Sequence, residues 1–148
     1  IACPYSPANV VDVENIAGLK IDQVLIGSCT NGSIEDMRIA EKYLRGKRIA
    51  PGVRMIVIPG TGEILYRMEK EGILSAFVLA GAVIAPSSCG ACMGGHSGVL
   101  GEDEVGLYTS NRNFHGRNGA LSSKVYLCSP AVAAYSAVSG RINVPGEE

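Results

Sequence analysis

The chain has 148 residues, a length typical of one domain with its own hydrophobic core. Apolar residues make up 47% of it, and the formal net charge is −1, with the basic residues spread along the chain. This balance argues against nucleic-acid binding, and no apolar run reaches the about 20 residues that cross a bilayer. The five cysteines lack the spacing of a disulfide framework, so we expect reduced thiols and a cytoplasmic protein.

The first part of the chain predicts a strand, a polar turn and a helix, after a lead-in segment over residues 1–20. The strand is the apolar run Gln23–Gly27, and the turn that follows contains Cys29. Ser33 has the character of a helix N-cap, with an acidic residue three positions later. Apolar residues then recur at helical spacing as far as Leu44, which predicts an amphipathic helix.

The same pattern recurs in the middle of the chain. Arg54–Ile58 predicts a second strand, broken by the turn at 59–62. A helix is expected from about Glu63, with Gly72 as its natural stop. The apolar segment Ala82–Ala85 then predicts the strand that leads into the second group of cysteines.

The last part of the chain predicts two more strands and a helix. The strands are Gly106–Thr109 and Lys124–Cys128. Ser129 and Pro130 are the residues expected at an N-cap and a first helical position, and this helix should end near Gly140. Alternating strands and helices favour an α/β domain over residues 1–148, with three α/β/α layers around a mostly parallel sheet.

Four polar loops follow the predicted strands: those of Cys29, Thr61, Cys89 with Cys92, and Asn111. Parallel strands end at the same edge of a sheet, and ligands bind outside their carboxyl ends. We therefore expect Cys29 to lie near the distant C-x-x-C motif.

Three cysteines, Cys29, Cys89 and Cys92, offer three thiolates without an evident fourth. A structural zinc site and an ordinary iron–sulfur cluster each need four ligands, so three thiolates leave one metal position open. An open position suits Lewis-acid catalysis. Two alternatives stay open: a zinc site completed by His96, and redox-active or structural thiols. Cys3 and Cys128 are interpreted as structural.

A second polar segment, residues 110–117, carries two arginines, two asparagines and a histidine after a strand. Arg112 and Arg117 suit a small di- or tricarboxylate, because arginine binds carboxylates through two parallel hydrogen bonds. The competing interpretation is a solvated surface loop. His115 is read as a loop residue rather than a base.

Four segments in this order, IGSCTNGSIEDMR, PSSCGACMGG, TSNRNFHGR and YLCSPAVAAYSAVSG, resemble the third domain of the aconitase superfamily. The resemblance covers about residues 20–140. It implies that the chain is part of a hydro-lyase, an enzyme that dehydrates a 2-hydroxy acid and rehydrates it at the neighbouring carbon. It also implies a [4Fe–4S] cluster with one iron that no cysteine binds.

The resemblance assigns the cluster ligands to Cys29, Cys89 and Cys92. Asn111 matches a residue that hydrogen-bonds near the cluster, and Arg112 and Arg117 match residues that bind substrate carboxylate or organise the site. The motif departs from the family in two places: Ala91 replaces the proline of C-G-P-C, and His115 stands where other residues are more common.

Within the superfamily the motifs resemble the two-subunit isopropylmalate and homoaconitate dehydratases more than citrate aconitases, although the lead-in is closer to bacterial aconitases. This implies a C-terminal fragment of a large subunit in leucine biosynthesis. Its partners would be the other large-subunit domains and a small subunit whose swivelling domain carries the serine base. We expect the isolated chain to be inactive. Two non-enzyme alternatives, a structural zinc module and an RNA-binding module, have less support from the sequence.

Overall fold

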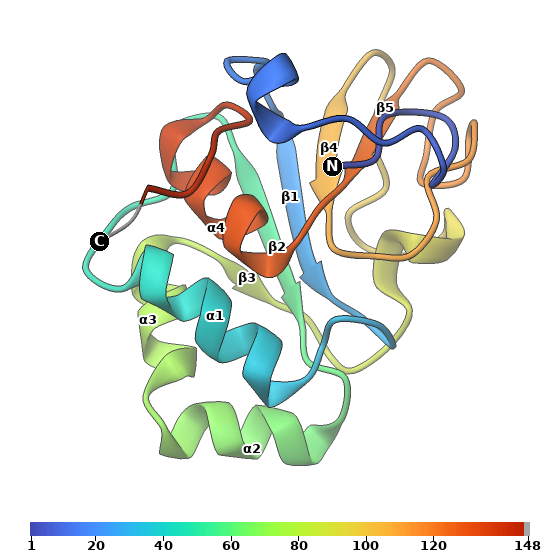
Figure 1. Cartoon of the computed structure of the whole chain (residues 1–148). Coiled ribbons are helices and arrows are strands. Elements are labelled where there is room, and N and C mark those ends of the chain that lie inside the picture. Colours follow the sequence, from blue (N-terminus) through green and yellow to red (C-terminus); the bar gives the residue numbers. More distant parts are fainter. Residues whose placement is uncertain (147–148) are drawn as a thin grey trace.

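The computed structural model describes residues 1–146, and the last two residues of the C-terminal tail lie outside it (Figure 1). The strands are β1 (Gln23–Gly27), β2 (Arg54–Ile58), β3 (Val83–Ile84), β4 (Val105–Tyr108) and β5 (Lys124–Leu127). The α-helices are α1 (Ile34–Leu44), α2 (Gly62–Lys70), α3 (Ile73–Ala80) and α4 (Pro130–Ser139). Two 3₁₀-helices, η1 (Val13–Ile16) and η2 (Gly90–Met93), complete the elements. No helix within these residues is long and apolar enough to span a membrane.

The sheet confirms the predicted α/β class. Its five strands are all parallel and lie in the order β3-β2-β1-β4-β5. The central strand β1 is buried over its whole length, as expected for a parallel strand covered on both faces. In its register, Leu25 lies opposite Ile56 of β2 on one side and Tyr108 of β4 on the other.

The predicted helix starts of α1 and α4 are confirmed. Ser33 and Asp36 form a reciprocal capping box at the start of α1, with each side chain accepting from the other residue's backbone N–H. Ser129 caps α4, Pro130 is its first residue, and Gly140 ends it in a left-handed conformation. These caps satisfy N–H groups that have no partner within the helix, and so fix where each helix begins.

The segment after α2 differs from the expectation, because a further helix, α3, follows Gly72 directly. Gly72 stops α2 as predicted, but its left-handed conformation (φ 73°) also turns the chain into α3. This helix is apolar on nearly every side, and Val78 and Leu79 remain 55% and 73% exposed. A short run without polar residues at regular intervals does not reveal a helix by its pattern.

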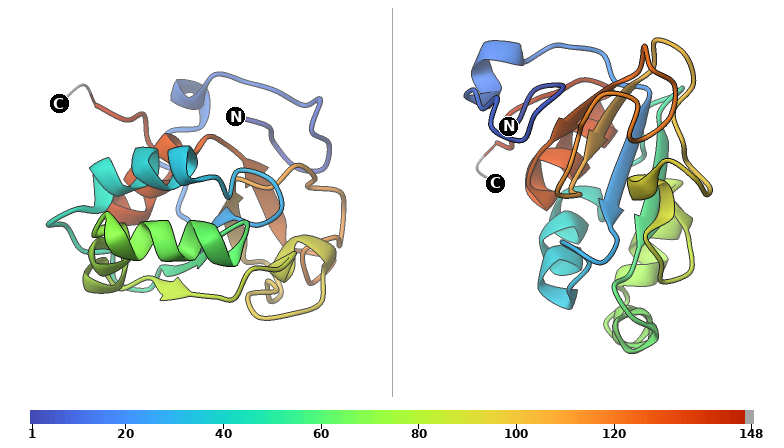
Figure 2. Two further views of the ribbon diagram at one scale, coloured as in Figure 1. Left: turned by 90° about the horizontal axis from the view of Figure 1, so that it is seen from below. Right: turned by 90° about the vertical axis from the view of Figure 1, so that its right-hand side faces the viewer.

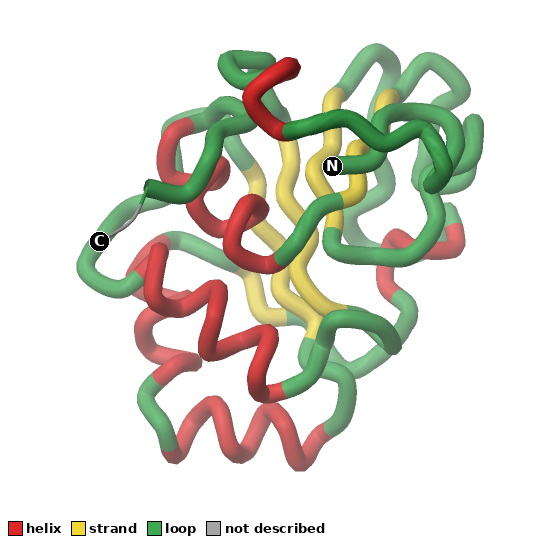
Figure 3. The backbone as a smooth tube through the Cα atoms, viewed as in Figure 1, coloured by secondary structure: helices red, strands yellow, loops and turns green. Residues whose placement is uncertain are grey.

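The two faces of the sheet are covered differently. Buried residues of all four α-helices belong to one apolar cluster, together with Val24 and Ile26 of β1. The opposite face, with Leu25, packs against Ala91 and Leu100 from the irregular segment that contains η2. Figure 2 shows α1 and α4 on one side of the strands and η2 on the other, and Figure 3 shows how much of that second layer is loop. The second layer is therefore built from the loops that carry the candidate site.

The lead-in segment packs on the domain and protects an edge of the sheet. Ala2 pairs with Leu127 of β5 in antiparallel fashion, through hydrogen bonds of 2.8 and 2.9 Å between their backbones. Ile1, Val13 and Ile16 pack against the helix-side core. The lead-in thus covers the strand edge that β5 would otherwise expose.

Candidate functional site

The candidate site lies where the order of the strands reverses. From β1 the chain proceeds to β2 on one side, and after β3 it crosses back to β4 on the other side of β1. The loops after β1 and β4 therefore diverge from neighbouring strands, which is where open α/β sheets bind ligands. Two contacts hold these loops together: Thr109 Oγ1 accepts from the Gly27 N–H (2.9 Å), and Asn31 Nδ2 donates to the Thr109 carbonyl (2.6 Å).

The loop after β1 presents Cys29 in an unusual backbone conformation. Gly27, Ser28 and Asn31 have φ values of 94°, 99° and 52°. A Cβ on Gly27 would lie 2.0 Å from the Ile58 carbonyl oxygen, so only glycine fits there. The Ser28 N–H donates to the same carbonyl (2.9 Å), which fastens the loop to the end of β2. The Cys29 side chain is left exposed.

The C-x-x-C motif forms the 3₁₀-helix η2. The Cys92 N–H donates to the Cys89 carbonyl (3.1 Å), and Gly94 ends the turn in a left-handed conformation. A Cβ on Gly94 would lie 2.5 Å from the Arg117 carbonyl oxygen, so glycine lets the two loops touch backbone to backbone. Cys89 is exposed, and Cys92 is buried at 4% exposure.

The structure brings the three predicted cysteines together. The pKa of the Cys89 thiol is raised, first by the negative charge of Cys29, then by a hydrogen bond with Cys29, and further by burial and by Cys92. Arg117 acts in the opposite direction and favours the Cys89 thiolate. Within residues 1–146, no three His, Cys, Asp or Glu side chains are already arranged to hold a metal ion. The thiols therefore converge without forming a closed ligand set.

The other two cysteines lie elsewhere. Cys128 packs against the helix-side core, and burial raises the pKa of its thiol. Cys3 belongs to the lead-in, and its backbone carbonyl accepts a hydrogen bond from the Asn113 amide (2.8 Å). All five cysteines are free, without a disulfide.

Of the three residues predicted beside the cysteines in the loop after β4, Arg117 lies near them, with its backbone carbonyl oxygen against Gly94 of the cysteine turn. Arg117 is half-buried and its charge acts on Cys89, whereas Asn111 and Arg112 are exposed. Arg112 donates to the Asn111 carbonyl (2.7 Å). Both residues lie on the exposed surface of the loop. His115 packs edge-on against the Tyr5 ring with centroids 4.6 Å apart.

Several buried polar atoms near the cysteines have no hydrogen-bond partner among residues 1–146. Four belong to the loops around the site: Thr30 Oγ1, Ser110 Oγ, Arg117 Nε and Asn118 Oδ1. Buried polar groups are nearly always paired, so a cluster of unpaired ones is typical of a place that binds a ligand or water. Sequence reasoning gave no role to Thr30, Ser110 or Asn118, although each adjoins a residue that it had singled out.

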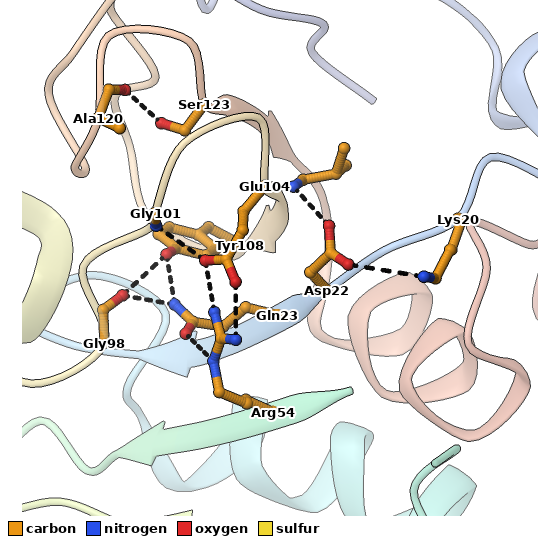
Figure 4. A network of polar contacts seen from close by, with 11 residues as sticks. Lys20, Asp22, Gln23, Arg54, Gly98, Gly101, Glu104, Tyr108, Ala120 and Ser123 are labelled. Carbon is orange, nitrogen blue, oxygen red and sulfur yellow. Dashed lines mark hydrogen bonds and ion pairs between the residues drawn. The ribbon is translucent and has the colours of Figure 1, made fainter. Parts of the chain in front are cut away.

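A polar network anchors the chain between the C-x-x-C motif and β4 (Figure 4). The Gln23 amide Nε2 donates to the Gly98 carbonyl and to the Tyr108 hydroxyl (2.6 Å), and that hydroxyl donates to Gly98 (3.2 Å). Arg54 donates to Gln23 Oε1 (3.1 Å) and forms a two-pronged ion pair with Glu104 (2.8 and 2.6 Å). Sequence patterns gave no sign of this network, because its members are far apart in the chain.

A separate cavity of about 480 Å³ lies beside β2 and β3, with Val83, Pro86 and Ser97 in its wall. None of its lining residues is a cysteine or belongs to the loop after β4. The cavity is therefore distinct from the cysteine site, and its walls are mainly apolar side chains.

The chain is similar to large subunits of 3-isopropylmalate dehydratase from several microorganisms. It is 51% identical to that of Nitratidesulfovibrio vulgaris over 99% of this chain, 54% identical to that of a Sulfurihydrogenibium species over 99%, and 52% identical to large subunit 1 of Methanopyrus kandleri over 98%. The match covers 35%, 34% and 35% of those proteins, so the chain spans about a third of the length of the relatives it matches.

The family model that matches is that of the aconitase family (aconitate hydratase), over residues 5–140. The match includes all the candidate site residues, from Cys29 to Arg117. It confirms the family indicated by the motifs around Cys29, Cys89 and Arg117. The chain therefore belongs to the aconitase family.

Proposed function

We propose that this chain is the part of an aconitase-family hydro-lyase that holds a [4Fe–4S] cluster through Cys29, Cys89 and Cys92. The observation that carries the proposal is the convergence of the three thiols, from loops some sixty residues apart, beside the cationic Arg117. Thiolates are the ligands that iron–sulfur clusters select, and three of them leave one iron open.

The residues around the thiols suit such a cluster. Gly90 and Gly94 leave the backbone of η2 without side-chain bulk, and both adopt positive φ values (54° and 78°). Arg117 supplies positive charge where three thiolates would gather negative charge. The unpaired buried hydroxyls of Thr30 and Ser110 supply hydrogen-bond donors in the adjoining loops.

In the proposed reaction, the chain's own side chains bind and orient the substrate. Arg117 and Arg112 bind substrate carboxylates, which the planar guanidinium matches through paired hydrogen bonds. Asn111, on the same exposed loop, hydrogen-bonds near the cluster. Metal binding requires thiolates, so loading the site releases the proton that the raised pKa keeps on Cys89. When bound, the cluster supplies a Lewis-acidic iron for the substrate hydroxyl and carboxylate.

The relatives reported above carry the name 3-isopropylmalate dehydratase large subunit. We propose the same substrate class here, the interconversion of 2- and 3-isopropylmalate in leucine biosynthesis; citrate and homoaconitate are the competing substrates to test. The other parts of a large subunit and a small subunit with the swivelling domain complete the site. We further propose a cytoplasmic location, in which the thiols stay reduced, and negligible activity for this chain alone.

Single cysteine-to-serine substitutions test the ligand assignment. Cys29→Ser, Cys89→Ser and Cys92→Ser should each abolish cluster assembly, since three ligands leave no redundancy. Cys3→Ser and Cys128→Ser are the matched controls and should retain the iron and sulfide content of the wild type. Loss of the cluster in a control with an intact fold, or its retention in one of the three ligand variants, would contradict the assignment.

The substrate is tested in the complete enzyme, assembled with the small subunit. Isopropylmalate should be turned over with the highest kcat/KM among isopropylmalate, citrate and homoaconitate. Arg117→Lys should mainly impair substrate binding or turnover, because lysine cannot reproduce a two-pronged contact. Unchanged kinetics for Arg117→Lys would remove Arg117 from the substrate site.

A further inference from the structure

One buried side chain, Asn118, ties the C-x-x-C motif to the loop after β4. It is 1% exposed and directly follows Arg117. Its amide Nδ2 donates to the carbonyl of Ala91, between the two cysteines of the motif (3.1 Å). Its own backbone carbonyl accepts from the Leu100 N–H (2.9 Å). A single residue therefore fixes both ends of the segment 91–100.

The contact with Ala91 lies inside the cysteine turn, between Cys89 and Cys92. The Ala91 carbonyl belongs to η2 and also accepts the Gly94 N–H (3.0 Å), so Asn118 fills its second lone pair. The orientation of the Asn118 amide is fixed, because flipping it would set two oxygens against each other. Its Oδ1 atom is buried and has no hydrogen-bond partner among residues 1–146.

The same loop carries the cation that acts on the cysteines. Arg117 directly precedes Asn118, and its backbone carbonyl oxygen lies against the backbone of Gly94, at the end of the cysteine turn. The Asn118 contact therefore sets the distance between two parts of the site: the cysteine turn and the loop with the carboxylate-binding arginine.

We propose that Asn118 is a positioning residue that holds the Cys89–Cys92 turn in register with Arg117, an inference that rests on the proposed cluster. Residues that orient metal ligands from outside the coordination shell typically change metal affinity by 10–100-fold when they are substituted. Asn118→Leu keeps the size of the side chain and removes its polar groups. We expect this variant to lose iron in air at least about ten times faster than the wild type.

Asn113 provides a matched control in the same loop. It is also 1% exposed, its Nδ2 donates to the carbonyls of Cys3 (2.8 Å) and Val125 (3.1 Å), and its Oδ1 is likewise unpaired. It contacts the lead-in and β5 rather than the cysteine turn. Asn113→Leu should therefore lower the unfolding temperature about as much as Asn118→Leu, but leave the rate of iron loss within twofold of the wild type.

The experiment uses the polypeptide that carries these residues, reconstituted without oxygen. Iron loss in air is followed by absorbance, and hydrogen exchange of the peptide over residues 89–100 is measured by mass spectrometry before and after loading. Asn118→Leu should raise exchange in this peptide even without the cluster, whereas Asn113→Leu should not. Asn118→Asp replaces the Nδ2 donor with a carboxylate oxygen and adds a negative charge; it serves as a second variant and should behave like Asn118→Leu.

Equal rates of iron loss in the folded Asn118 and Asn113 variants would overturn the proposal. So would failure of both Asn118 variants to fold while Asn113→Leu folds, because that result assigns Asn118 to the core. A wild type that binds zinc and no sulfide would refute the proposed function instead, and the hydrogen-exchange comparison would still test the positioning role.

Discussion

The Tyr108 hydroxyl offers a sharp test of how the loop after the C-x-x-C motif is anchored. Tyr108 and Gln23 are both fully buried (0% exposed). The hydroxyl accepts from Gln23 Nε2 and donates to the Gly98 carbonyl. Tyr108→Phe removes this hydroxyl and leaves the ring in place against Gly106.

The expected cost follows from which partner is left unpaired. The Gly98 carbonyl keeps its bond from Gln23, but one N–H of the Gln23 amide loses its acceptor in the interior. A buried polar group without a partner costs about 1–3 kcal/mol. We expect about 1–2 kcal/mol for Tyr108→Phe, which lowers the unfolding temperature of a chain of this size by roughly 3–8 °C.

Urea and thermal unfolding of Tyr108→Phe and of the control Tyr126→Phe measure this cost. Tyr126 lies on the adjacent β5, is only partly buried, and its substitution should change stability by less than about 0.5 kcal/mol. The double variant Tyr108→Phe with Gln23→Leu should be less destabilised than the sum of its single variants, since no unpaired amide remains. A Tyr108→Phe variant as stable as Tyr126→Phe would refute the reasoning.

Two further predictions concern the same part of the sheet. Gly106→Ala places a methyl carbon 2.7 Å from the Tyr108 ring and should cost about 1–3 kcal/mol by overpacking. Gly62→Ala, with open space around it, should be neutral or slightly stabilising, so equal melting temperatures would contradict the packing argument. The hydrogen bond from Arg54, and next the one from the Gly101 N–H, lower the pKa of Glu104. The Arg54–Glu104 ion pair therefore stabilises the fold above the ordinary carboxyl pKa, and this contribution is lost as the pH falls through the lowered pKa. Glu104→Gln should lower the free energy of unfolding by less than about 1 kcal/mol at pH 7, because Arg54 is half-exposed. This difference in stability from the wild type should shrink below about pH 4. A difference that does not depend on pH would argue against the ion pair.

Local sequence patterns were sufficient to predict individual strands and helices and many of their ends. The bounds of β1 and β2 and the caps at Ser33 and Ser129 agree with the structure, because each depends on residues within a few positions. The strand β4 begins and ends one residue earlier than predicted, although Thr109 still donates to Leu25 beside it. The prediction that Cys29 would approach the C-x-x-C motif needed only the parallel topology.

The features that escaped prediction depend on contacts across the chain. Helix α3 has no polar residues at regular intervals, so its sequence does not distinguish a helix from a buried strand. Asn118 holds Ala91 from 27 positions away, and Gln23 holds Tyr108 from 85 positions away. The second layer of the fold also lacks regular periodicity, because glycine-rich loops rather than an α-helix cover that face of the sheet.

The most direct test of the proposed function is the iron, zinc and acid-labile sulfide content per chain after anaerobic reconstitution, with electron paramagnetic resonance alongside. An open-site cluster predicts about four iron and about four sulfide, and a three-iron signal after mild oxidation, because the iron without a cysteine ligand leaves first. About one zinc per chain with no sulfide would contradict the cluster assignment and make the cysteines a zinc site.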